Sequence, residues 1–259
     1  MQTMNTPNFS VDLTGEVAFV TGTTSGLGRR FAQVLAQSGA KVVLTGRRIE
    51  KLNSLAEEIR NDGGVCEPFV MDVTDRDSMR TAVAAAEEKL GTITILVNNA
   101  GIPDAQRAVK MSDELIDKVM ETNLTAPFIL SCEVARRLMD KKMAGRIVNI
   151  SSIAAFDINS HSSASLYSVT KAGIARMTEA LALEWAKYNI NVNCIAPGAF
   201  LSEMMDGMIE RVGDFSKTFP RKRFGQPEQM DSTLLYLVSP SSECVTGTII
   251  MIDDGQSHR

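Results

Sequence analysis

The chain alternates short apolar runs with longer amphipathic stretches, and this alternation constrains its fold more than any other feature. Seven runs of three to six residues are almost wholly apolar: 17–20, 41–44, 68–70, 93–97, 147–150, 190–195 and 248–252. The stretches between them have helical periodicity: 28–38, 49–61, 77–90, 113–139, 165–188 and 228–237. Short apolar strands bounded by helices indicate a parallel sheet covered on both faces. We therefore predict an α/β fold, a doubly wound and mostly parallel seven-stranded sheet.

The chain has no internal repeat and no Pro/Ser-rich linker, so we expect residues 1–259 to form a single domain. Residues 1–12 would be an N-terminal arm, and the irregular segment at about 199–226 would be a lid inserted on the substrate side. The alternative for this segment is a surface excursion whose methionines fill gaps in the core.

Composition excludes several classes of partner. The formal net charge of -4 argues against nucleic acid and against an anionic membrane surface. The four cysteines have no metal-ligand spacing, so we expect reduced thiols and no metal site. The first ten residues lack the apolar core of a secretory signal, and no apolar run approaches the roughly 20 residues that span a bilayer. We predict a cytoplasmic protein that acts on a small molecule.

A glycine-rich turn follows the first predicted strand. Residues 21–28 read Thr-Gly-Thr-Thr-Ser-Gly-Leu-Gly, and a helix is expected to follow. Glycines let the backbone approach a ligand closely, and a helix N-terminus offers free N–H groups to a pyrophosphate. The pattern predicts a Rossmann-like dinucleotide site. Its expected contacts are Gly22, Thr24, Ser25, Gly26, Leu27 and Gly28.

The end of the second predicted strand indicates which dinucleotide binds. A free ribose 2′-hydroxyl usually meets an Asp or Glu there, but this chain has Arg47 and Arg48. Guanidinium groups can hold a 2′-phosphate by charge-assisted hydrogen bonds. We therefore predict NADP(H) in preference to NAD(H). The alternative is that both arginines are solvated charges at the start of a helix.

A phenol and an amine share one face of a later predicted helix, since Tyr167 and Lys171 stand four residues apart. A nearby cation favours a phenolate, so we expect Lys171 to lower the pKa of Tyr167. Ser151 and Ser152 follow the fifth apolar run, at the edge where open α/β sheets bind ligands. The pattern predicts an acid–base site and leaves open which of the two serine hydroxyls takes part.

Taken together, these motifs resemble the classical short-chain dehydrogenase/reductase family from about Thr14 to Gly255. The shared motifs are the glycine-rich turn, Asn-Asn-Ala-Gly at 98–101, the segment around Asn123, Ser-Ser at 151–152, Tyr-x-x-x-Lys at 167–171 and Pro-Gly at 197–198. The resemblance implies a soluble oxidoreductase that transfers hydride between NADP(H) and a carbonyl or secondary alcohol carbon.

The same resemblance implies roles for individual residues. Tyr167 would be the general acid or base, Ser152 would hold the substrate oxygen, and Lys171 would bind the nicotinamide ribose. Asn123 would anchor a water that relays protons to Lys171. Further cofactor contacts are implied at Asp72, Val73, Asn99, Ala100, Gly101, Pro197, Gly198, Phe200 and Ser202.

The substrate side is the least constrained part of the site. Fourteen residues separate Ser152 from Tyr167, more than is usual in the family, and this loop commonly borders the substrate. The residues that we expect near the substrate are Ser152, Phe156, His161 and Met204. Their apolar members favour a ketone, and 3-oxoacyl thioesters are one candidate class. A lone histidine in a serine-rich loop is more often just exposed.

Two further expectations come from the family. Reductases of carrier-bound acyl chains have arginines where this chain has Ile129 and Tyr188, which argues against a carrier-protein substrate. The resemblance also implies a homotetramer built from residues 113–139, 165–188 and the last strand. The alternative function is a catalytically silent dinucleotide-binding subunit of regulatory or structural type. No function is apparent from the sequence for Asp254, which replaces a common glycine.

Overall fold

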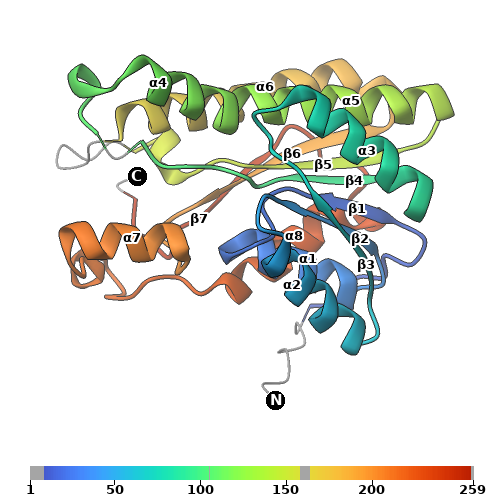
Figure 1. Cartoon of the computed structure of the whole chain (residues 1–259), viewed down its shortest axis with the longest axis horizontal. Helices are drawn as coiled ribbons and strands as arrows, with labels where there is room; N and C mark the ends of the chain where they lie inside the picture. Colours follow the sequence, from blue (N-terminus) through green and yellow to red (C-terminus); the bar gives the residue numbers. More distant parts are fainter. Residues whose placement is uncertain (1–8, 105, 158–163, 258–259) are drawn as a thin grey trace.

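A seven-stranded parallel sheet forms the centre of the protein, in the order β3-β2-β1-β4-β5-β6-β7 (Figure 1). The computed structural model describes residues 9–104, 106–157 and 164–257. The strands are β1 Val17–Val20, β2 Lys41–Gly46, β3 Val65–Val70, β4 Ile95–Asn98, β5 Gly145–Ile150, β6 Ile190–Pro197 and β7 Ile249–Ile252. The strand order reverses between β1 and β4, and open α/β sheets bind ligands at the carboxyl ends of the strands beside this point. The predicted fold class is confirmed.

Helices cover both faces of the sheet, with α1, α2 and α8 on one face and α3, α5 and α6 on the other (Figure 1). The helices are α1 Gly26–Gln37, α2 Ile49–Asn61, α3 Arg76–Leu90, α4 Asp113–Met120, α5 Ala126–Lys141, α6 Ser165–Trp185, α7 Glu203–Val212 and α8 Asp231–Val238. Among the residues that the structure describes, no helix is both long and apolar enough to cross a bilayer.

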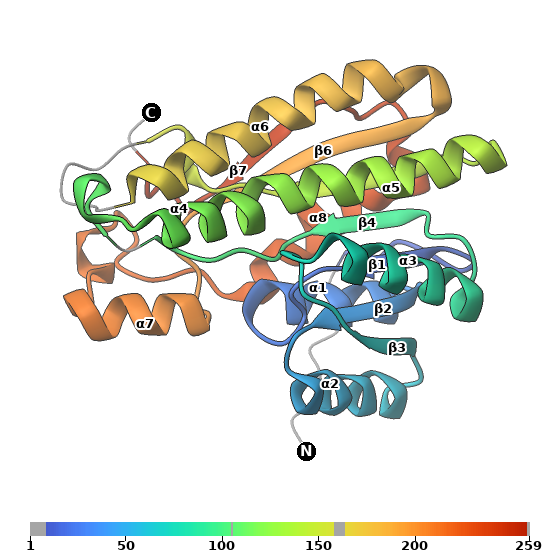
Figure 2. The same ribbon diagram turned by 45° about the horizontal axis from the view of Figure 1, so that its top comes forward.

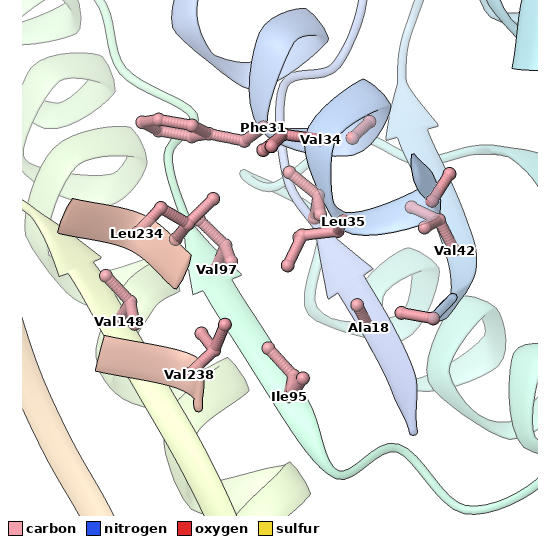
Figure 3. Packing of buried hydrophobic residues seen from close by; sticks show 14 of the residues in the cluster. Ala18, Phe31, Val34, Leu35, Val42, Ile95, Val97, Val148, Leu234 and Val238 are labelled. Carbon is pink, nitrogen blue, oxygen red and sulfur yellow. The ribbon is translucent and has the colours of Figure 1, made fainter. Parts of the chain in front are cut away.

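Each helical layer has its own hydrophobic core against the sheet. On the first face, Leu35 of α1 and Leu234 of α8 meet over β1 and β4 (Figure 3). On the second face, Leu130 of α5 and Trp185 of α6 are buried, so Trp185 is a core residue. Each fully buried large apolar side chain contributes roughly 1.5–3 kcal/mol, which makes the sheet a rigid support for the loops at its edge.

The predicted helix at 113–139 is interrupted. Between α4 and α5 lies one π-helical turn, Glu121–Thr125, which contains Asn123. Pro127, the second residue of α5, has no N–H to donate to the helix ladder. Such π-helical turns occur frequently at functional sites, and this one places the side-chain amide of Asn123 at the edge of the sheet.

The expectation of an irregular segment at 199–226 is wrong for its first half, which forms helix α7. Ser202 caps this helix by accepting a hydrogen bond from the N–H of Met205 at 3.2 Å, and Glu203 and Asp206 stand in its first turn. Both features stabilise a helix N-terminus and are visible in the sequence. Figure 2 shows α7 at one end of the sheet, apart from the two helical layers.

Candidate active site

The phosphate loop between β1 and α1 depends on glycine at three positions. Gly22 and Gly26 have φ values of +72° and +54°, which other residues rarely adopt. A side chain at Gly22 would lie 3.0 Å from Cα of Ala100, and one at Gly28 would overlap the carbonyl oxygen of Gly22. The loop is therefore a bare backbone cradle.

The N-terminus of α1 opens onto this cradle. Within the described part of the chain, the side chain of Ser25 makes no capping hydrogen bond, and the first turn of α1 contains no acidic residue. The free N–H groups and the positive end of the helix dipole are therefore available to an anion. A dinucleotide pyrophosphate fits this site, so the residues present agree with the predicted cofactor.

Arg47 lies at the end of β2, beside the end of β3. Its side chain is 62% exposed, and its Nη1 is 3.9 Å from Oδ2 of Asp72, at the ends of the neighbouring strands β2 and β3. Burial opposes ionisation of Asp72, but hydrogen bonds from Thr74 and the Arg47 charge leave its pKa below the usual value. The two residues line a shallow cavity beside Lys118 and Glu121 of the α4 region.

Arg48 points elsewhere, across the phosphate loop. Its Nη2 donates to Oγ1 of Thr24 at 2.7 Å and to Oγ of Ser25 at 3.3 Å, and it pairs with Oε2 of Glu203 at 2.8 Å. Lys51 pairs with the same carboxylate, and the two cations lower the pKa of Glu203 to about 2. Sequence reasoning did not find Glu203, which joins α7 to α2; an acid directly after a capping serine was the available signal.

The loop after β4 is fastened to the phosphate loop. Oγ1 of Thr21 accepts hydrogen bonds at 2.9 Å from the N–H groups of Asn99 and Ala100. The Asn99 side chain donates to the carbonyl oxygen of Thr21 at 2.9 Å. Asn99 and Ala100 therefore border the cradle, and a side chain at Gly101 would lie near Asn123 and Lys171. Leu27 and Val73, two further predicted cofactor contacts, pack partly against the two hydrophobic cores.

The structure brings the four predicted catalytic residues together. Ser152 lies close enough to the Tyr167 phenol to act on its pKa, and Nζ of Lys171 is 5.5 Å from the centre of the Tyr167 ring. Nζ of Lys171 donates to the carbonyl oxygen of Ile150 at 2.8 Å. Asn123 is buried and exchanges two hydrogen bonds of 2.9 Å with the backbone of Ile102.

The pKa of Tyr167 is not lowered by Lys171 in this structure, so that expectation is wrong here. Burial raises the pKa of the phenol, the hydrogen bond from Ser152 opposes the rise, and the charge of Asp104 adds to it. Burial also lowers the pKa of Lys171 to about 8. The reason is desolvation, which penalises the charged form of both groups.

The two serines differ in their partners. Oγ of Ser151 donates to the carbonyl oxygen of Lys171 at 2.7 Å and is buried. Ser151 therefore attaches α6 to β5, and only Ser152 presents its hydroxyl to Tyr167. Asn98 has a structural role as well, because it donates to Oδ1 of Asn149 at 2.8 Å within a buried polar network.

The residues at the end of β6 and just after it differ in where their side chains lie. Ser202 faces the cradle, since a side chain at Gly26 would lie 2.9 Å from its Cβ. Gly198 packs closely on the backbone of Asp253, and Pro197 ends β6. Phe200 instead buries its ring in the core against Gly225. Any contact of Phe200 with a cofactor is therefore limited to its backbone.

Two of the expected substrate residues have exposed side chains at this end of the sheet. Phe156 is 49% exposed and Met204 is 40% exposed. His161 lies outside the described residues. Asp254 has a structural partner set, because its carboxylate accepts from Nε of Arg223 at 2.8 Å and pairs with Nη1 of Arg221 at 3.0 Å. It therefore ties the segment after α7 to the end of the chain.

Comparisons with known proteins agree with this geometry. The family model for short chain dehydrogenases matches residues 16–212. A 3-oxoacyl-[acyl-carrier-protein] reductase of Thermotoga maritima is 36% identical, over 94% of this chain and 98% of that protein. A gluconate 5-dehydrogenase of Gluconobacter oxydans is 35% identical, over 94% of this chain and 95% of that protein.

A solved structure extends the likeness to three dimensions. The gluconate 5-dehydrogenase of Burkholderia cenocepacia, in complex with NADP and tartrate, superposes with a TM-score of 0.87 at 30% identity, over 95% of this chain and 96% of that one. Fold, cradle and relatives thus agree on a nicotinamide-dependent oxidoreductase of carbonyl or alcohol carbons. The chain belongs to the short-chain dehydrogenase family.

Proposed function

We propose that this protein is an NADP(H)-dependent ketone reductase in which Tyr167 is the acid. One observation carries the proposal: the phenol of Tyr167 lies beside Ser152 and one helical turn before the buried amine of Lys171, whose Nζ is 5.5 Å from the centre of its ring. A hydroxyl pair at the carboxyl edge of the sheet, beside a dinucleotide cradle, is suited to protonating an oxygen.

Each residue has a distinct task in this proposal. The nicotinamide supplies the hydride when it is bound. Ser152 donates a hydrogen bond to the substrate oxygen and so stabilises the negative charge that develops there, and Tyr167 delivers the proton to the same oxygen. Lys171, 4% exposed, holds the cofactor ribose and is the next proton donor to the phenol. Asn123 fixes the loop around Ile102 beside this route.

The preference for NADP(H) is supported by charge at the end of β2. Arg47 is exposed beside a cavity, and the two positions directly after β2 are Arg47 and Arg48 rather than the acid with which an NAD(H) enzyme holds the ribose hydroxyls. The NADP complex of the related gluconate dehydrogenase is consistent with this choice. Arg48 supports the cradle through Thr24 rather than the phosphate itself.

The substrate that we propose is a ketone with an apolar part. Phe156 and Met204 offer exposed apolar surface at the sheet edge, and relatives act on both acyl and sugar-derived compounds. Ile129 and Tyr188 offer no cation to a carrier protein. A silent dinucleotide-binding subunit is disfavoured, because the complete set of four polar residues is assembled.

A panel of ketones, aldehydes and alcohols tests the proposal, with nicotinamide absorbance followed for NADPH and NADH. We expect turnover of apolar ketones with NADPH, and we expect Tyr167→Phe to abolish it while NADPH affinity changes less than about 3-fold, since the phenol is a proton donor rather than a main binding group. Full activity in Tyr167→Phe, or turnover of small polar substrates alone, would contradict the proposal.

A further inference from the structure

Asp104 is a buried acid beside the proposed catalytic residues. It has no role in the proposed reaction. It lies in the loop after β4 and is 3% exposed. The same loop contacts the proposed site twice more. Ile102 is hydrogen-bonded to Asn123, and a side chain at Gly101 would lie 3.6 Å from Nζ of Lys171.

Asp104 completes the start of the helix that carries Tyr167. The residue before α6 is Ala164, whose side chain cannot cap, and the first turn of α6 contains no acid. Oδ2 of Asp104 accepts a hydrogen bond from the N–H of Tyr167 at 3.0 Å. A carboxylate from a distant loop thus satisfies an N–H group that the helix itself leaves free, and it holds Tyr167 through its backbone.

The second carboxylate oxygen is unusual. Oδ1 of Asp104 is buried and accepts no hydrogen bond from any residue that the structure describes. A cap needs only one acceptor oxygen, which an asparagine would also provide. Burying a charged oxygen without a partner is costly, so the cap alone does not account for an acid at this position.

The negative charge has a second target in the same turn, the Tyr167 phenol. The titratable groups of the described residues that face this phenol are Asp104 from the β4 loop and Lys171 on α6, with the Cys194 thiol of β6 behind Lys171. Burial raises the pKa of Cys194 to about 11, so this thiol is neutral. A fixed negative charge disfavours a phenolate nearby.

We propose that Asp104 is a positioning residue that anchors Tyr167 and keeps its phenol protonated, which favours carbonyl reduction over alcohol oxidation. The inference rests on the proposed acid role of Tyr167. Reduction needs the phenol as a proton donor, whereas oxidation needs the phenolate as a base. The charge of Asp104 therefore moves alcohol oxidation to higher pH and leaves reduction near neutral pH unaffected.

The test separates the charge from the hydrogen bond. Asp104→Asn keeps an oxygen that can accept from the Tyr167 N–H and removes the charge, whereas Asp104→Ala removes both. Asp62→Asn, at the exposed end of α2, removes the same charge far from the site and is the matched control. Circular dichroism and thermal unfolding establish that each variant is folded.

Tyrosinate absorbance provides a readout that needs no substrate. The chain has three tyrosines, so the titration of Tyr167 is the difference between a protein and its Tyr167→Phe partner. We expect the Tyr167 midpoint in Asp104→Asn to fall by about one pH unit, and the acid limb of the pH profile for alcohol oxidation to fall with it. Asp62→Asn should match the wild-type midpoint.

Two results would overturn the inference. One is an unchanged Tyr167 midpoint in Asp104→Asn. The other is equal loss of activity in Asp104→Asn and Asp104→Ala with an unmoved pH profile, which marks a purely structural contact. If Tyr167→Phe is inactive, either result refutes only the role of Asp104 and not the proposed reductase function. Activity in Tyr167→Phe refutes the proposed function itself, whatever the Asp104 variants do.

Discussion

Under the proposed function, removing Arg47 should weaken NADPH binding far more than NADH binding. The guanidinium of Arg47 is 62% exposed and its one ion pair among the described residues, with Asp72, spans 3.9 Å. It is therefore free to bind a phosphate without first breaking a strong contact. In Arg47→Ala the phosphate of NADPH would lose its cation and would meet the carboxylate of Asp72 unshielded.

The size of the effect follows from the exposure of the site. Two opposite unit charges 4 Å apart attract by about 1 kcal/mol in bulk water, and a phosphate monoester carries almost two charges. Because Arg47 is highly exposed, its attraction to the phosphate should be close to this value in water for each phosphate charge, about 2 kcal/mol in all. Losing it should weaken NADPH binding about 30-fold. NADH has no such phosphate, so its affinity should change less than about 3-fold.

Fluorescence titration of both cofactors measures this difference, with Arg48→Ala as the matched control. Arg48 is hydrogen-bonded to Thr24 of the cradle, so its loss should weaken NADPH and NADH alike. The proposed NADPH preference of the wild type should also shrink at high salt, because the pair of Arg47 and the phosphate would be exposed to screening. Equal losses of the two cofactors in Arg47→Ala, or selective loss of NADPH in Arg48→Ala, would refute the reasoning.

Two further predictions concern stability. Burial holds the pKa of Lys171 at about 8 against an ordinary 10.5, so between these pH values the unfolded chain binds more protons. The free energy of unfolding of the wild type should therefore rise by up to about 3 kcal/mol relative to that of Lys171→Met as the pH increases through this window. Urea unfolding of both proteins near pH 7 and pH 10 measures this change. A difference between them that stays constant with pH contradicts the prediction. Gly28→Ala should lose dinucleotide binding and about 1–3 kcal/mol of unfolding free energy, because the new side chain would overlap Gly22. Gly207→Ala on α7 should stabilise the protein slightly, because the new side chain would make only an ordinary contact with Arg211 at 3.9 Å. Equal effects of the two changes in thermal unfolding would be the contrary result.

The sequence predicted the features whose physical cause is local. Strands and helices were recognisable because apolar periodicity is a property of neighbouring residues, and the fold class followed from their alternation. The cradle was recognisable because positive φ at Gly22 and Gly26 is a backbone requirement that glycine meets. Tyr167 and Lys171 were recognisable as a pair because four residues are about one helical turn.

The oligomeric state, unlike these local features, depends on the surface of the protein. The homotetramer stays a prediction, since it concerns contacts between copies of the chain. Apolar side chains on the helices involved are consistent with it: Leu183 of α6 is 85% exposed and Phe128 of α5 is 47% exposed.

The tertiary structure decided which distant groups meet. Asp104 reaches the N–H of Tyr167 across 63 residues, and Glu203 reaches Lys51 across 152 residues. The buried pair of Arg30 and Asp231 joins α1 to α8 across 201 residues, with Nε and Oδ1 3.0 Å apart. No local pattern encodes such partners. They are set by which strand ends and helix faces come together when the sheet closes its two cores, and the pKa values of the site follow from that burial.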